Sequence, residues 1–362
     1  MFYTWPQAID GFDDPDLKKK IQWDIPLLEG YEWEAVENVS KQPGSKKWNG
    51  IDCPRLNDRI KDFGPDAILV YGWNLKSHFR VMRHFKGKVP VWFTGDSTLL
   101  DEKPGLRKWV RRLMLTLVYR FIDKALYVGT HNKAYFKAHG LQEDQLVFFP
   151  HAIDNERFRD GPDKNYNEKA LKWRSELGYN KEDFVVLFAG KLEDKKNPLL
   201  LLDAVQKINQ EHSSGMSSIS GNAVHLLFVG NGPLENILKE RAKDDPNVKF
   251  LPFQNQAKMP IVYRLGSVFV LPSKGPGETW GLAVNESLAC GVQAIVSDKV
   301  GCGPDLLEKE IFNSNNLKEL NNKIIEKKNT LIGDFNTVTA ELLQKYNYTN
   351  KASEVENTMA DQ

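Results

Sequence analysis

Cysteine is scarce in this sequence of 362 residues, which contains only Cys53, Cys290 and Cys302. Their number is odd and their spacing matches no metal-ligand pattern, so the sequence argues against a disulfide framework and against a zinc site. We therefore expect free thiols in a reducing compartment.

An excess of charge and a long apolar run are also lacking. The 49 Lys and Arg residues nearly balance the 48 Asp and Glu residues, so no overall field indicates nucleic acid or an acidic substrate as a partner. No apolar run reaches the roughly 18 residues of a membrane span, and no basic-then-apolar export signal opens the chain. We expect a cytoplasmic protein.

What is present in the second half is an alternation of short β-rich runs with helical patterns. The runs occupy residues 184–190, 224–230, 248–253, 268–273 and 293–298. Nearly continuous apolar strands belong in a parallel sheet that is covered on both faces. This half is therefore predicted to be a doubly wound α/β domain.

The first half is similar but less regular. Strands are predicted at residues 66–72, 89–96, 124–130 and 146–150, and helices at about 74–86 and 132–139. A polar stretch at 150–183 serves as the connection. We expect an α/β protein of two Rossmann-like domains, residues 1–160 and 161–337.

Two glutamates, Glu278 and Glu286, flank the start of a predicted helix. A wholly helical stretch would hold their Cα atoms roughly 12 Å apart, which suits a ligand's length rather than an acid–base pair. Between them, Gly281 and Leu282 fall where a first helical turn leaves N–H groups unpaired and able to bind an anion. The order acid, amides, acid complements the hexose, diphosphate and ribose of a nucleotide sugar. For either glutamate alone, a solvated side chain is the better explanation.

Two upstream loops carry supporting patterns. Lys191 and Lys196, in GKLEDKKNP, follow the strand at 184–190 and suit a diphosphate leaving group, although lysine-rich loops are usually only solvated. Gly230 and Gly232, around Asn231, would permit close approach to a ligand or mark a tight turn.

The segment ETWGLAVNESLACGVQAIVSD, with GKLEDKKNP and VGNGPL upstream, resembles the signature of the retaining glycosyltransferases of family 4, which have the GT-B fold. The resemblance implies two Rossmann-like domains that face each other across a cleft, with residues 338–362 crossing back onto the first. It is strong over about 184–310, moderate over 66–160 and faint earlier, apart from QWDIPLLEGYEWE. The strand, glycine-rich turn and helix that usually open the fold have no counterpart, so we expect a reduced first domain or a late start.

The resemblance also implies roles on the donor side. Glu278 would bind the hexose, Glu286 the ribose, and Lys191 with Lys196 the pyrophosphate. Lys191 stands where the family has arginine and cannot form its bidentate fork. Trp280 would line the sugar site or, as an alternative that we favour, pack the helix against the sheet. The remaining donor-binding residues expected are Thr279, Gly281, Leu282, Gly230, Asn231, Gly232 and Phe253.

On the acceptor side, Asp96 stands near the place where many family members have a histidine, and we expect it to take part in catalysis or to cap a helix or turn. His131 and Asn132 follow the strand at 124–130 and are expected acceptor contacts. His151 is a further acceptor-side candidate, with an ordinary hydrogen-bonded loop histidine as the alternative.

Residues 103–124 predict a helix with apolar positions at 106, 109, 110, 113, 117 and 121 among many basic residues. Such a helix is typical either of a peripheral contact with an anionic membrane or of a core helix with solvated bases. The excess of basic residues in an otherwise neutral chain favours the membrane contact.

The resulting hypothesis is a retaining, metal-independent glycosyltransferase that needs no cofactor and moves a hexose from a nucleotide sugar, with a UDP-sugar favoured. Its acceptor would be a glycan or lipid-linked hydroxyl in cell-surface polysaccharide or glycolipid synthesis, at the inner face of the plasma membrane, with no nucleic acid involved. Two alternatives stay open, a non-catalytic nucleotide-sugar-binding or scaffold subunit and a sugar-nucleotide epimerase.

Overall fold

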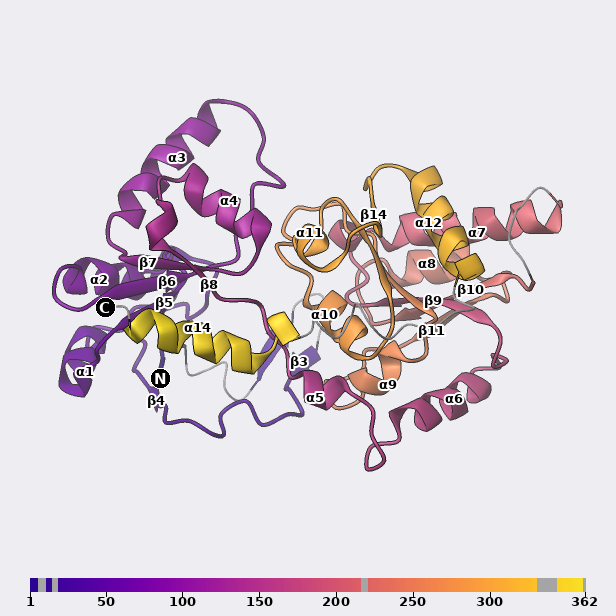
Figure 1. Cartoon of the computed structure of the whole chain (residues 1–362), viewed down its shortest axis with the longest axis horizontal. Helices are drawn as coiled ribbons and strands as arrows, with labels where there is room; N and C mark the ends of the chain where they lie inside the picture. Colours follow the sequence, from indigo (N-terminus) through magenta and orange to yellow (C-terminus); the bar gives the residue numbers. More distant parts are fainter. Residues whose placement is uncertain (6–10, 15–18, 216–220, 331–343, 361–362) are drawn as a thin grey trace. The chain divides into compact units, whose positions relative to one another are not determined.

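The computed structural model describes residues 1–5, 11–14, 19–215, 221–330 and 344–360. The chain divides into two compact units (Figure 1). Unit 1 comprises Met1–Pro150 and Ala352–Gln362, and unit 2 comprises His151–Lys351. The sequence places these divisions near residues 160 and 338, and residues 338–343 of the predicted returning segment lie outside the described part of the chain.

Unit 2 is built on a six-stranded parallel sheet with the order β11-β10-β9-β12-β13-β14. The strand order reverses between β9 and β12, so the chain leaves these two neighbouring strands in opposite directions along the sheet. Ligands of open α/β sheets bind at such a switch point. The strands are β9 (Phe184–Ala189), β10 (Val224–Val229), β11 (Val248–Leu251), β12 (Val268–Leu271), β13 (Ala294–Ser297) and β14 (Ile311–Phe312).

Helices cover both faces of this sheet (Figure 1). Apolar residues of α7, α8 and α12 pack on one face, against Val186 and Val270. On the other face, Tyr263 of α9 contacts Phe269 of β12 with ring centroids 5.6 Å apart. Every residue of β9 and β12 is buried, as their continuous apolar sequences predict. The helices are α5 (Asn155–Phe158), α6 (Tyr166–Glu176), η4 (Asp194–Lys196), α7 (Pro198–Ser213), α8 (Glu235–Arg241), α9 (Met259–Tyr263), α10 (Leu282–Ala289), α11 (Gly303–Leu306) and α12 (Leu317–Thr330).

Unit 1 contains a smaller parallel sheet with the order β5-β6-β7-β8. Its strands are β5 (Ile68–Tyr71), β6 (Val91–Thr94), β7 (Lys124–Tyr127) and β8 (Leu146–Phe148), and its helices are η2 (Trp48–Gly50), α1 (Leu56–Phe63), α2 (Lys76–Phe85), α3 (Leu106–Tyr119), α4 (Thr130–Ala138) and η3 (Glu143–Gln145). Short strands pair outside this sheet, β1 (Phe2–Tyr3) with β4 (Glu34–Ala35) and β2 (Phe12–Asp14) with β3 (Lys19–Ile21).

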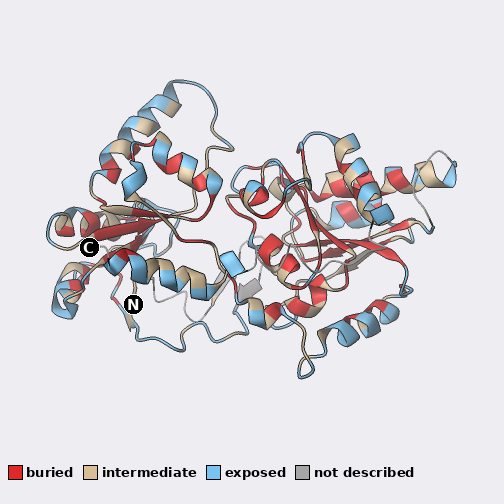
Figure 2. Cartoon of the chain, in the orientation of Figure 1, coloured by how far each residue is buried: buried red, intermediate tan, exposed pale blue. Residues whose placement is uncertain are grey.

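Side-chain alternation gives the sheet of unit 1 two buried faces, as Figure 2 shows by the concentration of buried residues in the strands. Phe93 and Ala125 belong to the larger core, to which α1 to α4 contribute. Trp92 and Leu126 face the other way, and Val355 of α14 (Tyr348–Ala360) packs against that second cluster. The last turns of α14 therefore belong to unit 1.

Unit 1 also contains a cavity of about 920 Å³ lined by β1, α1 and β5. Its walls include Phe2, Ile60 and Leu69. None of the site residues predicted from the sequence lines it, so the predicted chemistry is separate from this cavity.

Candidate active site

The loops that follow β9 and β12 are joined directly at the switch point of unit 2. Lys196, at the end of η4, donates from Nζ to Oε2 of Glu278 over 2.5 Å. The Ser273 hydroxyl donates to the same oxygen over 2.9 Å. A backbone hydrogen bond of 2.9 Å from Lys274 N to Lys195 O ties the two loops again. The predicted residues Lys196 and Glu278 thus lie together, although 82 positions separate them.

Glu278 is largely buried, which argues against a solvated loop acid. Its side chain is 10% exposed, and that of Lys196 is 21% exposed. Both hydrogen bonds reach Oε2, whereas Oε1 accepts none from a described residue. A carboxylate held in this way keeps one oxygen for the hydroxyl groups of a ligand.

Helix α10 begins at Leu282, with Gly281 as its N-cap. Gly281 has a left-handed φ of 99°, and a Cβ at this position would lie 2.8 Å from Cγ1 of Val300. The first turn presents the N–H groups that an anion can accept. Residues 278–281 are not helical, so the separation of roughly 12 Å expected for a continuous helix does not apply.

Glu286 lies one turn further along α10 and has a tyrosine partner. The Tyr263 hydroxyl donates to Glu286 Oε2 over 2.6 Å. Burial raises the pKa of Glu286 above its ordinary value of 4.5, whereas the Tyr263 hydrogen bond and the nearby Arg157 charge oppose this rise. The sequence analysis missed both partners, because Tyr263 shows only the apolar pattern of a short helix and Arg157 lies far away in the sequence.

The Gly-Asn-Gly loop after β10 binds its neighbouring loops. A Cβ on Gly230 would lie 2.0 Å from Gly190 O, and one on Gly232 would lie 2.4 Å from Leu192 O. The expected close approach is therefore made to the protein's own backbone. Asn231 Oδ1 accepts from the Phe253 N–H over 2.8 Å, so this side chain links the ends of β10 and β11.

Trp280 fills a packed position. It is 4% exposed, and its indole N–H donates to Asn285 Oδ1 over 2.8 Å. Its ring contacts His151 and Tyr346 with centroid distances of 5.7 and 5.6 Å. This geometry favours the packing alternative for Trp280. His151, expected on the acceptor side, lies in unit 2.

Lys191 and Thr279 lie near the Lys196–Glu278 contact in the sequence. Both are partly buried, Lys191 just after β9 and Thr279 between Glu278 and Trp280. Their proximity to the Lys196–Glu278 contact follows from the chain, and their roles stay predictions.

The residues of unit 1 that the sequence predicts on the acceptor side lie after β6, in the case of Asp96, and in the first turn of α4, in the case of His131 and Asn132. Asn132 is buried. Its Oδ1 accepts from Val128 N over 3.0 Å and its Nδ2 donates to Ser97 O over 2.8 Å. The amide therefore holds the loop that contains Asp96, which leaves it little capacity for an acceptor. Asp96 and His131 are partly buried beside it.

Two further features concern metal-binding groups and membrane-spanning helices. Among the described residues, no group of three or more His, Cys, Asp and Glu side chains could hold a metal ion. In the same part of the chain, no helix combines the length and apolar character needed to cross a membrane.

Comparison with known proteins matches residues 170–330 to the family described as Glycosyl transferases group 1. Spore coat protein SA of Bacillus subtilis is 31% identical over 140 residues, covering 38% of this chain and 35% of that protein. The UDP-Gal:alpha-D-GlcNAc-diphosphoundecaprenol alpha-1,3-galactosyltransferase of Escherichia coli is 29% identical over 158 residues, covering 42% of this chain and 37% of that protein. The matched part thus spans just over a third of these relatives.

Solved structures are similar over most of the chain. Anabaena HepE in complex with UDP and glucose gives a TM-score of 0.64 at 17% identity, covering 91% of this chain and 86% of that chain. Sucrose-phosphate synthase from Thermosynechococcus elongatus gives 0.64 at 16% identity, covering 100% and 88%. At these identities the likeness concerns the fold. The chain therefore has the GT-B fold, and its residues 170–330 match the family described as Glycosyl transferases group 1.

Proposed function

We propose that this protein is a retaining glycosyltransferase that moves a hexose from a nucleotide sugar, with a UDP-sugar favoured, to an acceptor hydroxyl. The observation that carries the proposal is the Lys196–Glu278 contact at the β9/β12 switch point, directly before the N-terminus of α10. An acid, a cation and the N–H groups of the first turn of α10 meet there, and a nucleotide sugar offers groups for each.

In this proposal, each part of the donor meets one of these groups. Its hexose hydroxyls donate to Glu278, whose Oε1 accepts no hydrogen bond from a described residue. Its diphosphate meets the first N–H groups of α10 together with Lys191 and Lys196. Its ribose hydroxyls donate to Glu286, which already accepts a hydrogen bond from Tyr263.

The proposed reaction breaks the bond between the anomeric carbon and the diphosphate oxygen. Negative charge grows on the leaving diphosphate, where the lysine ammonium groups and the helix amides stabilise it. The leaving oxygen accepts the proton of the attacking hydroxyl, which approaches on the same face, so the anomeric configuration is retained. Glu278 serves as a binding group in this scheme, because Lys196 and Ser273 hold its Oε2.

Relatives support the choice of substrates. UDP is bound in the solved structure of HepE, and the Escherichia coli relative is named for UDP-galactose and a diphosphoundecaprenol acceptor. We therefore favour UDP as the carrier and a glycan or lipid-linked acceptor in cell-surface polysaccharide or glycolipid synthesis. The protein would work at the cytoplasmic face of a membrane, without metal or cofactor.

The test is nucleotide release from UDP-, GDP- and ADP-sugars, measured with Glu278→Gln and with Ser273→Ala as a milder change at the same contact. We expect slow hydrolysis of one donor class. Its rate should fall about 100-fold or more in Glu278→Gln, because a preorganised group at the reacting sugar is lost, and less in Ser273→Ala, which leaves the carboxylate in place.

Two results would contradict the proposal. Nucleotide binding without release in any acceptor mixture would assign the chain to the non-catalytic scaffold class. Equal rates of nucleotide release by wild type and Glu278→Gln would show that Glu278 has no role in the reaction.

A further inference from the structure

Helix α3 exposes apolar side chains along much of its length, and Figure 2 shows the helix mostly in the colours of exposed and intermediate residues. With 100° between successive residues, the exposed positions fall within an arc of about 140°. Contiguous exposed apolar surface of this kind marks an interaction site. The arc consists of Leu106, Trp109, Val110, Leu113, Met114 and Leu117, which are 41% to 79% exposed.

The opposite side of α3 provides its contact with unit 1. Leu115, Val118 and Tyr119 are buried in the core, and Tyr119 contacts Phe93 with ring centroids 5.6 Å apart. The apolar arc is therefore additional to the core face and is not required for packing. The sequence analysis grouped residue 121 with the apolar positions of this helix. In the structure, Phe121 does not belong to the exposed arc but packs against Phe79.

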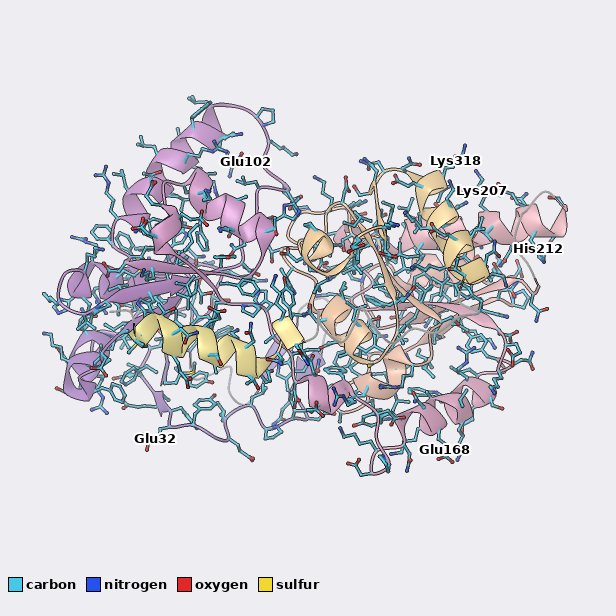
Figure 3. The ribbon with its side chains drawn as sticks, in the orientation of Figure 1. Glu32, Glu102, Glu168, Lys207, His212 and Lys318 are labelled. Atoms are coloured by element: carbon cyan, nitrogen blue, oxygen red, sulfur yellow. The ribbon has the colours of Figure 1, made fainter. Side chains whose placement is uncertain are left out.

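The basic side chains in and just after α3 differ in their partners, and Arg111 donates to the Tyr135 hydroxyl over 3.2 Å. Glu102, labelled beside α3 in Figure 3, pairs with Lys108 at 2.8 Å and with Arg112 at 3.0 Å. By contrast, the side chains of Arg107 and Arg120 are exposed and form no ion pair or hydrogen bond with any described residue. These two positive charges lie beside the apolar arc.

We propose that the apolar arc is a membrane-docking surface, with α3 lying in the headgroup region of an anionic bilayer. The arc enters the acyl boundary, Trp109 suits the interface, and Arg107 and Arg120 meet lipid phosphates. This inference deepens the proposed function, and it rests on that function only for the lipid-linked nature of the acceptor.

A second copy of the chain fits the arc less well. A two-fold pairing would apply the same patch to itself and would bring the unpaired Arg107 and Arg120 of both copies to one interface. An anionic membrane surface instead neutralises these charges. The charges beside the apolar arc therefore favour a membrane over a second copy as its partner.

Vesicle sedimentation of the full chain tests the proposal, using phosphatidylcholine vesicles with and without phosphatidylglycerol. We expect binding to the anionic vesicles and a loss of about tenfold or more in Leu113→Glu, which places a charge at the centre of the arc. The matched control is Leu171→Glu on α6, where the leucine is 48% exposed and binding should not change.

The electrostatic part is tested separately. Arg107→Gln with Arg120→Gln should weaken binding to anionic vesicles by about thirtyfold, since each basic residue near such a surface contributes a factor of about five. Arg55→Gln, an exposed arginine next to α1, is the control and should bind as wild type.

Absence of binding to anionic vesicles, or full binding by Leu113→Glu, would overturn the proposal. A dimer in solution that Leu113→Glu converts to monomer, without vesicle binding, would assign the arc to a second copy. Failure of the catalytic proposal is distinguishable, because Glu278→Gln should bind vesicles normally and Leu113→Glu should retain nucleotide release from a soluble donor.

Discussion

At the scale of single residues, the site of unit 2 depends on contacts between side chains that are far apart in sequence. Lys196 and Glu278 were each predicted from a motif, and the structure adds that they bind one another. Tyr263, in contrast, occupies one oxygen of Glu286. A hydrogen bond of this kind restricts the orientation of the carboxylate, and in the proposed site the other oxygen would accept from the ribose.

The raised pKa of Glu286 leads to a pH prediction. Burial favours its protonated form in the free protein, whereas ribose hydroxyls donate best to the carboxylate. UDP binding should therefore weaken as the pH falls from neutrality through the raised pKa of Glu286, and binding should release protons. Because the phosphates of UDP also titrate, the measurement is the difference between wild type and Glu286→Gln in calorimetric titrations at several pH values. Identical pH profiles for the two proteins would contradict this role of Glu286.

The same pKa has a consequence for stability. An acid whose folded-state pKa lies above 4.5 binds more protons when folded than when unfolded. Its contribution to the free energy of unfolding is therefore greatest below the unfolded pKa and is lost as the pH rises through the folded pKa. Glu286→Gln should remove that part of the pH dependence, which chemical denaturation at a series of pH values would detect.

At the scale of elements, the start of α10 is the most demanding part of the site. Its N-cap, Gly281, has a φ of 99°, and a Cβ at this position would clash with the side chain of Val300. Glycine is needed there for two reasons, one conformational and one steric. The helix can therefore begin close to the loop at residue 300.

Gly281→Ala should lower the free energy of unfolding of unit 2 by about 2–3 kcal/mol and weaken UDP binding. The matched control is Gly291→Ala, where φ is 75° but no atom lies within 4 Å of the added Cβ. Because only the backbone cost operates at Gly291, the control should lose about 1 kcal/mol. The measurements are urea denaturation and UDP titration. Equal losses in the two variants would show that the contact with Val300 is unimportant.

At the scale of the whole molecule, the chain leaves unit 1, forms unit 2 and then returns. Residues Ala352–Gln362 belong to unit 1, where Val355 covers the cluster of Trp92, Leu126 and Phe149. Thr358, on the same helix, is also buried. Unit 1 therefore includes a segment that follows unit 2 in the sequence, and this segment packs on its second sheet face.

Truncation after Lys351 should destabilise unit 1 by about 2 kcal/mol, roughly the value of one buried aliphatic side chain, and should leave UDP affinity unchanged, because the predicted donor residues all lie in unit 2. Tryptophan fluorescence during denaturation would report mainly unit 1, which contains seven of the nine tryptophans, and UDP titration would follow unit 2. Truncation after Ala360 is the control. An unchanged unfolding midpoint in the longer truncation would contradict the role of Val355.

The sequence by itself determined the parallel strands and the loops that carry the motifs. Continuous apolar runs can only be buried on both faces of a sheet, so β9 and β12 were predictable, as was the start of a helix at Gly281 and Leu282. The strand order that makes these strands neighbours, and hence brings Lys196 to Glu278, required the tertiary structure.

Tertiary structure also decided which side chains are available to a ligand. The sequence showed that Asn132, Asn231 and Trp280 are polar or aromatic residues near motifs, and the fold uses all three to hold loops and helices together. It likewise turned the apolar arc of α3 outward. The physical reason is the same in each case. The periodicity of a sequence shows whether one face of a helix or strand is polar or apolar. The residues that cover this face come from distant parts of the chain.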